Sequence, residues 1–118
     1  MLKGCEELFN KEIQLVHCDD HSLTFNFKDG TKYEFADHAE NCCEKRYIHT
    51  DDCLNYFKDS KFVNAEVQDG PTTGDVNNYE VNDSQYLIIT TTKGQFTIVN
   101  HNDHNGYYSG FDLVVTKV

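Results

Sequence analysis

Cysteine and histidine are the residue types in this sequence most able to bind a metal, and three cysteines and two histidines gather between residues 38 and 53. If residues 37–44 form a helix, His38 and Cys42 stand four residues apart and face the same side. Zinc prefers about four nitrogen or sulfur ligands in a tetrahedron. A site closed by thiolates leaves no position for water, so it would be structural. The expected ligands are His38, Cys42, Cys43 and Cys53, with His49 as a further candidate.

The same residues also allow an interpretation without metal. In that case Cys42 and Cys43 are small buried side chains, and His38 caps a helical turn. A second group near the N-terminus is a weaker candidate, because His17 and Cys18 are neighbours on an expected strand and point to opposite faces. Five cysteines without a secretory signal do not suggest a disulfide framework, so we expect free thiols or metal ligands in a cytoplasmic protein.

Catalytic patterns are scarce in the sequence. The paired carboxylates, such as Asp19 and Asp20, are adjacent and therefore diverge, whereas a general acid and base must converge on a substrate. No serine follows a strand-to-helix elbow pattern, and no glycine-rich loop precedes a helix. A nucleophile at Cys42 or Cys43 is the remaining catalytic alternative, but the chain offers a single arginine to stabilise an oxyanion. We therefore expect a protein that is not an enzyme.

Charge is the dominant feature of the composition. The 118 residues, enough for one domain covering 1–118, carry 20 acidic against 10 basic side chains, a formal net charge of −10. Such a balance repels phosphate backbones and anionic membranes, which argues against direct nucleic-acid or membrane binding. It would attract a basic protein. The acidic residues expected to contact that partner are Asp51, Asp52, Asp75, Glu80 and Asp83.

A tyrosine-containing motif offers a different kind of contact. In residues 105–109 the Asn-Gly pair favours a left-handed turn, after which Tyr107 and Tyr108 project to opposite sides. Tyrosines in a loop make good contacts with a protein or a stacked nucleobase at low entropic cost. In the plainer alternative, one tyrosine packs on the core and the other closes the loop.

Alternation of apolar and polar residues predicts mostly strands. Asp29-Gly30 is typical of a tight hairpin turn. One or two helical turns are expected after Asp37, and a short helix capped by an aspartate after residues 51–52. Residues 68–84 and 101–110 are expected to be loops. The predicted fold is α+β, with an antiparallel sheet of six or seven strands and one or two short helices. Strands are expected around 13–27, 33–35, 47–48, 62–67, 86–92, 95–99 and 111–118.

Several motifs in a fixed order resemble an uncharacterised family of small phage and prophage proteins. They are His-x-x-x-Cys-Cys-Glu at residues 38–44, Ala-Glu at 65–66, Thr-Lys-Gly at 92–94 and Asn-Gly-Tyr-Tyr-Ser at 105–109. A small acidic phage-type domain is also similar, as a class, to the Cas9-directed (type II) anti-CRISPR inhibitors. That similarity implies a protein in the host bacterial cytoplasm that binds a basic surface of Cas9 and blocks DNA loading or binding. The alternative is a sponge that sequesters a nucleotide second messenger of an antiphage system.

Overall fold

Two antiparallel sheets make up the computed structural model, which describes residues 2–39, 44–75, 80–104 and 110–118. The first sheet has the strand order β1-β2-β3-β9. Its strands are β1 (Ile13–Cys18), β2 (Ser22–Phe27), β3 (Lys32–Asp37) and β9 (Leu113–Lys117). The expected Asp-Gly turn joins β2 to β3: Gly30 has φ of +88°, and a carboxylate oxygen of Asp29 accepts the backbone N–H of Thr31 at 2.9 Å.

The second sheet is longer and has the order β4-β8-β7-β5. A short strand, β6, also pairs with β7, beyond the end of β5 on the same edge. The long hairpin of β7 and β8 turns at Lys93-Gly94, as expected, and pairs from Val81 opposite His104 to Thr91 opposite Gly94. The strands are β4 (Lys45–His49), β5 (Phe62–Asp69), β6 (Thr73–Asp75), β7 (Glu80–Thr91) and β8 (Gly94–His104).

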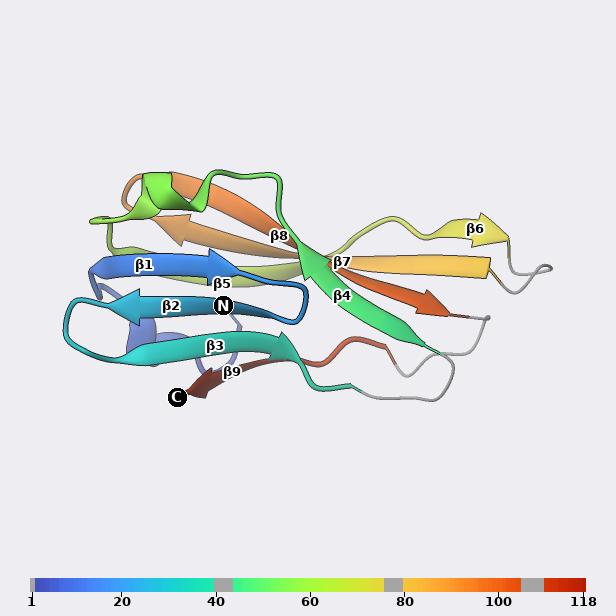
Figure 1. The fold of residues 1–118 in the computed structure, drawn as a ribbon, viewed down its shortest axis with the longest axis horizontal. Coiled ribbons are helices and arrows are strands. Elements are labelled where there is room, and N and C mark those ends of the chain that lie inside the picture. Colours follow the sequence, from blue (N-terminus) through green and yellow to red (C-terminus); the bar gives the residue numbers. More distant parts are fainter. Residues whose placement is uncertain (1, 40–43, 76–79, 105–109) are drawn as a thin grey trace.

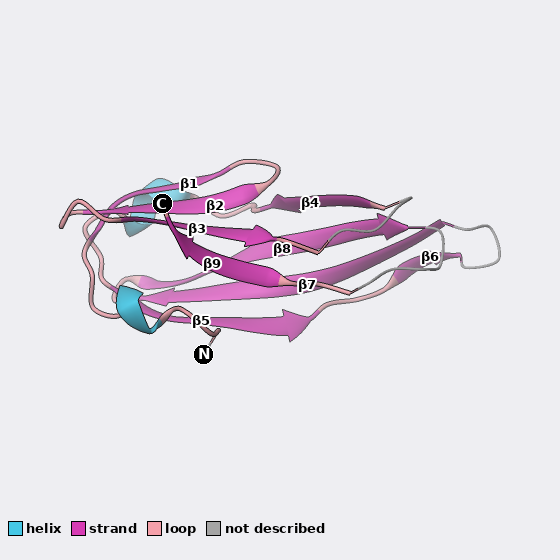
Figure 2. Cartoon of the chain, turned by 90° about the horizontal axis from the view of Figure 1, so that it is seen from below, coloured by secondary structure: helices cyan, strands magenta, loops and turns pink. Residues whose placement is uncertain are grey.

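The two sheets lie one over the other, and they share a core at one end of an elongated molecule measuring 49 × 23 × 22 Å (Figures 1 and 2). Phe25 on β2 lies at the centre of this core, with ring centroids 5.6 Å from Phe62 and 6.3 Å from Phe96 on the other sheet. Two 3-10 helices, η1 (Glu6–Leu8) and η2 (Leu54–Phe57), add Leu8 and Phe57 to the same cluster. The apolar residues at alternating positions of these strands therefore form the contact between the two sheets.

The structure confirms antiparallel sheet as the main architecture and corrects the rest of the predicted fold class. The described residues form nine strands in two sheets and two 3-10 helices, so the protein is mainly β and not an α+β fold with a single sheet. Residues 13–27 divide into two strands at a turn around residues 19–21, where the Asp19 carboxylate accepts the N–H groups of His21 and Ser22 at 2.8 Å each. No helix in the described ranges is long and apolar enough to cross a membrane.

Two segments expected to be loops contribute to strands. Residues 68–84 include the end of β5, all of β6 and the start of β7, and residues 101–104 extend β8. These segments are rich in Asn, Asp and Gly, residues that are depleted in strands, so composition argued against pairing. These polar segments continue strands whose apolar parts are paired in the second sheet, so the backbone hydrogen bonds between the strands extend into them. The central part of the helix expected after Asp37, residues 40–43, lies outside the described residues. The helix expected near 51–57 is η2, but its N-cap is Cys53, without a side-chain cap.

Candidate functional site

The inner face of the β7–β8 hairpin changes from apolar to polar along its length. Near the turn this face carries Leu87, Ile89, Phe96 and Ile98, all in the core. Further along the same face, Asp83, Asn100, Asn102 and His104 are also buried. Burying polar groups costs free energy unless they are hydrogen-bonded. This row of buried polar side chains is therefore the candidate for a functional role in the interior.

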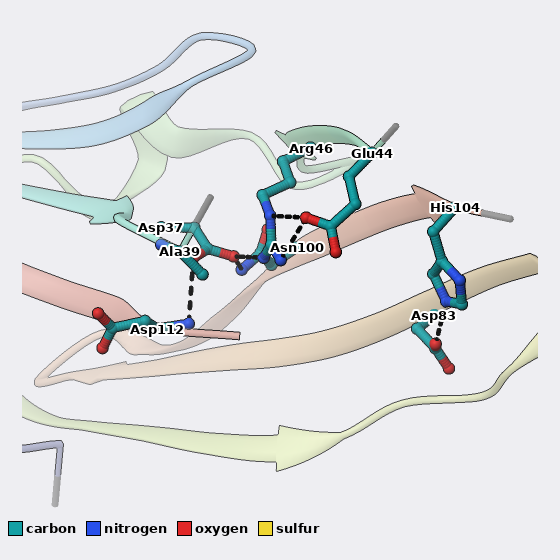
Figure 3. A network of polar contacts seen from close by, with 8 residues as sticks. All are labelled: Asp37, Ala39, Glu44, Arg46, Asp83, Asn100, His104 and Asp112. Carbon is teal, nitrogen blue, oxygen red and sulfur yellow. Dashed lines mark hydrogen bonds and ion pairs between the residues drawn. The ribbon is translucent and has the colours of Figure 1, made fainter. Parts of the chain in front are cut away.

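Asp37, at the end of β3, is the centre of a hydrogen-bond network between the two sheets (Figure 3). One carboxylate oxygen accepts Arg46 Nη1 at 2.8 Å and Asn100 Nδ2 at 2.9 Å. The other accepts the backbone N–H groups of Ala39 at 2.9 Å and Asp112 at 3.0 Å. These four donors come from β4, β8 and the segments flanking β3 and β9, so a single carboxylate links both sheets.

Arg46 completes the network through Glu44. The Nε and Nη2 groups of Arg46 donate to Glu44 Oε2 at 3.1 and 2.9 Å, while Nη1 is bonded to Asp37. The side chain of Arg46 is 13% exposed, and those of Asp37 and Glu44 are 5% and 1% exposed. The guanidinium also lies 6.0 Å from the centre of the Phe111 ring. Two buried carboxylates therefore share one cation.

A cavity of about 320 Å³ opens beside this network, between the first sheet and β4. Asp20, Glu34 and Asp37 supply carboxylates to its lining, and Arg46, already paired, is the only lysine or arginine there. His21, Tyr47 and Asn100 also line it. The cavity is therefore suited to a group that carries positive charge or donates hydrogen bonds, and it is poorly suited to a phosphate.

A second buried pair lies further along the hairpin. His104 Nε2 is 2.6 Å from a carboxylate oxygen of Asp83, and the Thr72 hydroxyl donates to the other oxygen. Between this pair and the Arg46 network lies Asn102, which is 0% exposed and whose side chain has no hydrogen-bond partner in the described parts of the chain. An alternating pattern in the sequence indicates these buried polar positions on β8, and the prediction of a loop at residues 101–110 did not use it. Asn100, Asn102 and His104 alternate at every second position, in phase with the buried Phe96 and Ile98.

The structure describes two of the four predicted zinc ligands, His38 and Cys53, so the zinc site stays a prediction. His38 is exposed, and its backbone N–H donates to the carbonyl of Asp112. Cys53 is an exposed free thiol at the N-cap of η2, while Cys42 and Cys43 lie outside the described residues. Within residues 2–39, 44–75, 80–104 and 110–118, no group of three or more His, Cys, Asp and Glu side chains could hold a metal ion.

Two further cysteines serve as packing residues. Cys5 is completely buried, and burial, reinforced by the nearby Glu6 charge, raises the pKa of its thiol to about 12. Burial also raises the pKa of the Cys18 thiol. Because the thiolate is the nucleophile and the metal ligand, neither group is prepared for either role at neutral pH.

The acidic residues expected to contact a partner are not equivalent. Asp51 is exposed, and Asp52 is exposed but accepts the backbone N–H of Thr97 at 2.9 Å. Asp83 is 7% exposed and paired with His104, so the expectation of a surface contact at this residue needs correction: its carboxylate belongs to the interior. Asp75 and Glu80 are opposite each other in the β6–β7 pair. Their side chains, like Tyr107 and Tyr108, lie outside the described residues.

Charges are separated along the molecule. Seven of the nine lysines lie at the end that holds the core, which we call the lysine end: Lys11, Lys28, Lys32, Lys58, Lys61, Lys93 and Lys117. There Lys28 pairs with Glu12 and Asp59, and Lys11 pairs with Asp29. The opposite end in Figure 1, which we call the acidic end, comprises residues 69–75, 80–84 and 100–104. These residues include five acidic side chains and no lysine or arginine, although Lys45 on β4 is opposite Asp103.

Comparison with known families gives one match. Residues 6–114 match the model of a domain of unknown function, DUF7448. The chain belongs to this family. No curated protein and no solved structure matches it. The DUF7448 match covers β1 to β8 and the start of β9, including the Arg46 network and the acidic end, so most of the architecture described above lies within the family's domain.

Proposed function

We propose that this DUF7448 protein acts by binding, with its acidic end docked against a basic surface of another macromolecule. The observation that carries the proposal is the separation of charge along the molecule. Residues 69–75, 80–84 and 100–104 combine acidic side chains with an absence of lysine and arginine, while most lysines lie at the other end, where Lys11 and Lys28 pair with carboxylates. A cationic partner would therefore be attracted more strongly to the acidic end than to the lysine end, where lysines and carboxylates offset one another.

The length of the molecule supports this orientation. Charges in salt solution interact over a Debye length of about 8 Å at physiological ionic strength. The molecule is 49 Å long, so the lysine end does not neutralise the field at the acidic end. A partner that approaches the acidic end experiences local negative charge, in addition to the net charge of −10.

The cavity beside Arg46 supplies a specific contact for such a partner. Its carboxylates come from Asp20, Glu34 and Asp37, and its volume of about 320 Å³ can admit a lysine or arginine side chain. Asp37 already accepts four hydrogen bonds, which leaves Asp20 and Glu34 as the carboxylates able to receive a new donor. A basic side chain in this cavity would add selectivity to the long-range attraction.

Among basic partners, we propose a nucleic-acid-handling protein, with Cas9 as the specific candidate. Cas9 holds guide RNA and target DNA in positively charged channels. An acidic end on a narrow molecule, 23 × 22 Å across, fits the role of a competitor for such a channel, and binding there would block DNA loading. The proposal needs no catalytic step, and the stability of two packed sheets keeps the charges in fixed positions.

The test is binding to Cas9 at several salt concentrations, with paired charge reversals. We expect the affinity to fall as NaCl rises from 50 to 300 mM, and Asp69→Lys with Asp75→Lys to weaken it about tenfold, since a single surface ion pair contributes up to ~1 kcal/mol. The matched control is Glu6→Lys with Glu7→Lys in η1, which changes the net charge equally but lies at the lysine end. Asp51→Lys tests the exposed carboxylate between β4 and η2.

Equal losses in both double variants would contradict docking through the acidic end, because only net charge would then matter. Binding that is insensitive to salt, or no binding to Cas9, would contradict the proposal for that partner. In the latter case, a thermal shift with cyclic nucleotides would favour the nucleotide sponge. The structure gives that alternative little support, because the donors of Arg46 are bonded to Asp37 and Glu44.

A further inference from the structure

Two histidines come together on the outer face of the second sheet, away from the core. Tyr47 on β4 is opposite His101 on β8, and His49 is the next residue on the same face of β4, because Ile48 between them points into the core. The His101 ring lies nearly parallel to both neighbours, with its centroid 4.6 Å from that of Tyr47 and 4.8 Å from that of His49. Strand pairing thus brings together histidines 52 positions apart in the sequence.

The nitrogen atoms of the two rings face each other. His49 Nδ1 and His101 Nε2 are 3.0 Å apart. The other nitrogen of His101, Nδ1, is 3.3 Å from Asn82 Oδ1 on β7. His49 is exposed and His101 is half-buried, so the pair is open to solvent on one side.

The neighbours of His101 determine its tautomer. The side-chain Nδ2 of Asn82 donates to the Asp103 carboxylate, which only accepts, so the amide must present its oxygen to His101. His101 Nδ1 therefore carries a proton and donates it to Asn82. It follows that Nε2 of a neutral His101 presents a lone pair to His49.

We propose that His49 Nδ1 and His101 Nε2 bind a divalent transition-metal ion, such as Ni²⁺, Cu²⁺ or Zn²⁺. Imidazole nitrogens coordinate these ions at about 2.0–2.1 Å, and two such bonds at angles of about 90–109° separate the nitrogens by about 2.8–3.4 Å. The 3.0 Å separation lies within this range, and rotation of the exposed His49 ring out of its parallel arrangement would direct both lone pairs at one ion. The proton on His49 Nδ1 moves to Nε2 of the same ring, which is exposed, and water fills the remaining coordination positions.

The supporting residues resemble the outer ligands of known metal sites. A metal-binding histidine usually donates its second N–H to a carbonyl or carboxylate, which fixes the ring and its tautomer. The chain from His101 through Asn82 to Asp103 provides this arrangement. The site is separate from the predicted zinc ligands His38, Cys42, Cys43 and Cys53, and it is independent of the proposed function.

The experiment is titration of the intact protein with NiCl₂, followed by calorimetry and by the NMR signals of the histidine rings. Nickel suits imidazole ligands, whereas the cysteine candidates favour zinc. To separate the two sites, the titration is repeated in a Cys42→Ser, Cys43→Ser background. We expect one Ni²⁺ per chain in both proteins, with ring signals of His49 and His101 broadened or shifted first.

Single variants test the ligands and their support. His49→Gln and His101→Gln should each weaken Ni²⁺ binding at least tenfold, and Asn82→Leu should weaken it about tenfold through the orientation of His101. His17→Gln, at an exposed histidine on β1 of the other sheet, is the matched control and should bind as the wild type does. The thermal transitions of all variants establish that they fold. Unchanged binding in His49→Gln and His101→Gln, or no binding at 1 mM NiCl₂, would overturn the proposal.

Discussion

Arg46 is the only arginine in the chain, and its position determines which buried charges the fold can tolerate. Isolated ionised carboxylates are very costly to bury, but Asp37 and Glu44 surround one guanidinium with several short hydrogen bonds. A lysine at this position would reach one carboxylate as a point charge, whereas the planar guanidinium can contact both. The single arginine is therefore used for structure and not for recognition of a phosphate.

We predict that Arg46→Met lowers the free energy of unfolding by about 3 kcal/mol, because it leaves two buried carboxylates without their cation. Urea denaturation at pH 7 measures the change. Lys45→Met is the control, since Lys45 is an exposed neighbour on the same strand and its loss should cost at most about 0.5 kcal/mol. Equal stability of the two variants would show that the Arg46 network contributes nothing beyond surface charge.

At the level of single residues, the sequence identified candidate side chains but not all of their neighbours. The histidines and cysteines were singled out as candidate ligands by type and by proximity along the chain, and proximity could not indicate the neighbour that strand pairing gives His49. Its close partner is His101, which β4–β8 pairing brings alongside. Arg46 and Asn100 meet at Asp37 across sequence separations of 9 and 63 residues, and no local pattern indicates such a contact.

Strand β8 shows how one element can carry two kinds of interior. Its inward positions run from Phe96 and Ile98 to Asn100, Asn102 and His104, without a change of register. The apolar positions hold the two sheets together, and the polar positions continue the same ladder beyond the core. Asn100 donates to Asp37, whereas the Asn102 side chain has no hydrogen-bond partner among the described residues.

This contrast predicts opposite effects of the same substitution at two positions on one face of β8. Asn102→Leu should raise the free energy of unfolding by about 1 kcal/mol, since it replaces an unpaired buried amide with an apolar group of similar shape. Asn100→Leu should lower it by about 1–3 kcal/mol, since it removes a donor from the buried Asp37 carboxylate. Urea denaturation measures both, and a destabilised Asn102→Leu would show that this amide is paired in solution.

The elements were predicted well where alternation was apolar and poorly where it was polar. The β2–β3 hairpin, the short strand β4 and the turn at Lys93-Gly94 were confirmed. The expected loop at residues 68–84 was largely wrong because Asn, Asp and Gly are common in loops, and only pairing with the apolar part of β5 and β7 extends the strands there. The division into two sheets could not be predicted, since alternation fixes which face a residue occupies but not which strand it pairs with.

For the molecule as a whole, charge opposes stability at one end and supports it at the other. The acidic end carries carboxylates with few nearby cations, while ion pairs such as Lys28 with Asp59 hold the lysine end. Exposed ion pairs contribute little, a median of about 0–1 kcal/mol each. With a net charge of −10, repulsion at the acidic end should therefore dominate the response to salt.

We predict that the thermal midpoint rises by about 4 °C between 10 and 150 mM NaCl, as the Debye length falls from about 30 to 8 Å and repulsion between carboxylates is screened. Differential scanning calorimetry measures the change. The thermal midpoint of the Asp69→Lys, Asp75→Lys double variant should rise less with salt than that of the wild type. The midpoint of the Glu6→Lys, Glu7→Lys double variant should rise more with salt than that of the first double variant. A midpoint that falls with salt would mean that the ion pairs of the lysine end outweigh the repulsion.

The separation of an apolar core at one end from an arginine-centred network further along has a consequence for cooperativity. The aromatic contacts across the sheets that join Phe25 to Phe62 and Phe96 lie in one half of the molecule. Beyond it, the described link between β3, β4 and β8 is made by Asp37 and the groups bonded to it. Local opening of that half would break these polar contacts while leaving the aromatic core intact, so we expect its backbone amides to exchange with solvent without global unfolding.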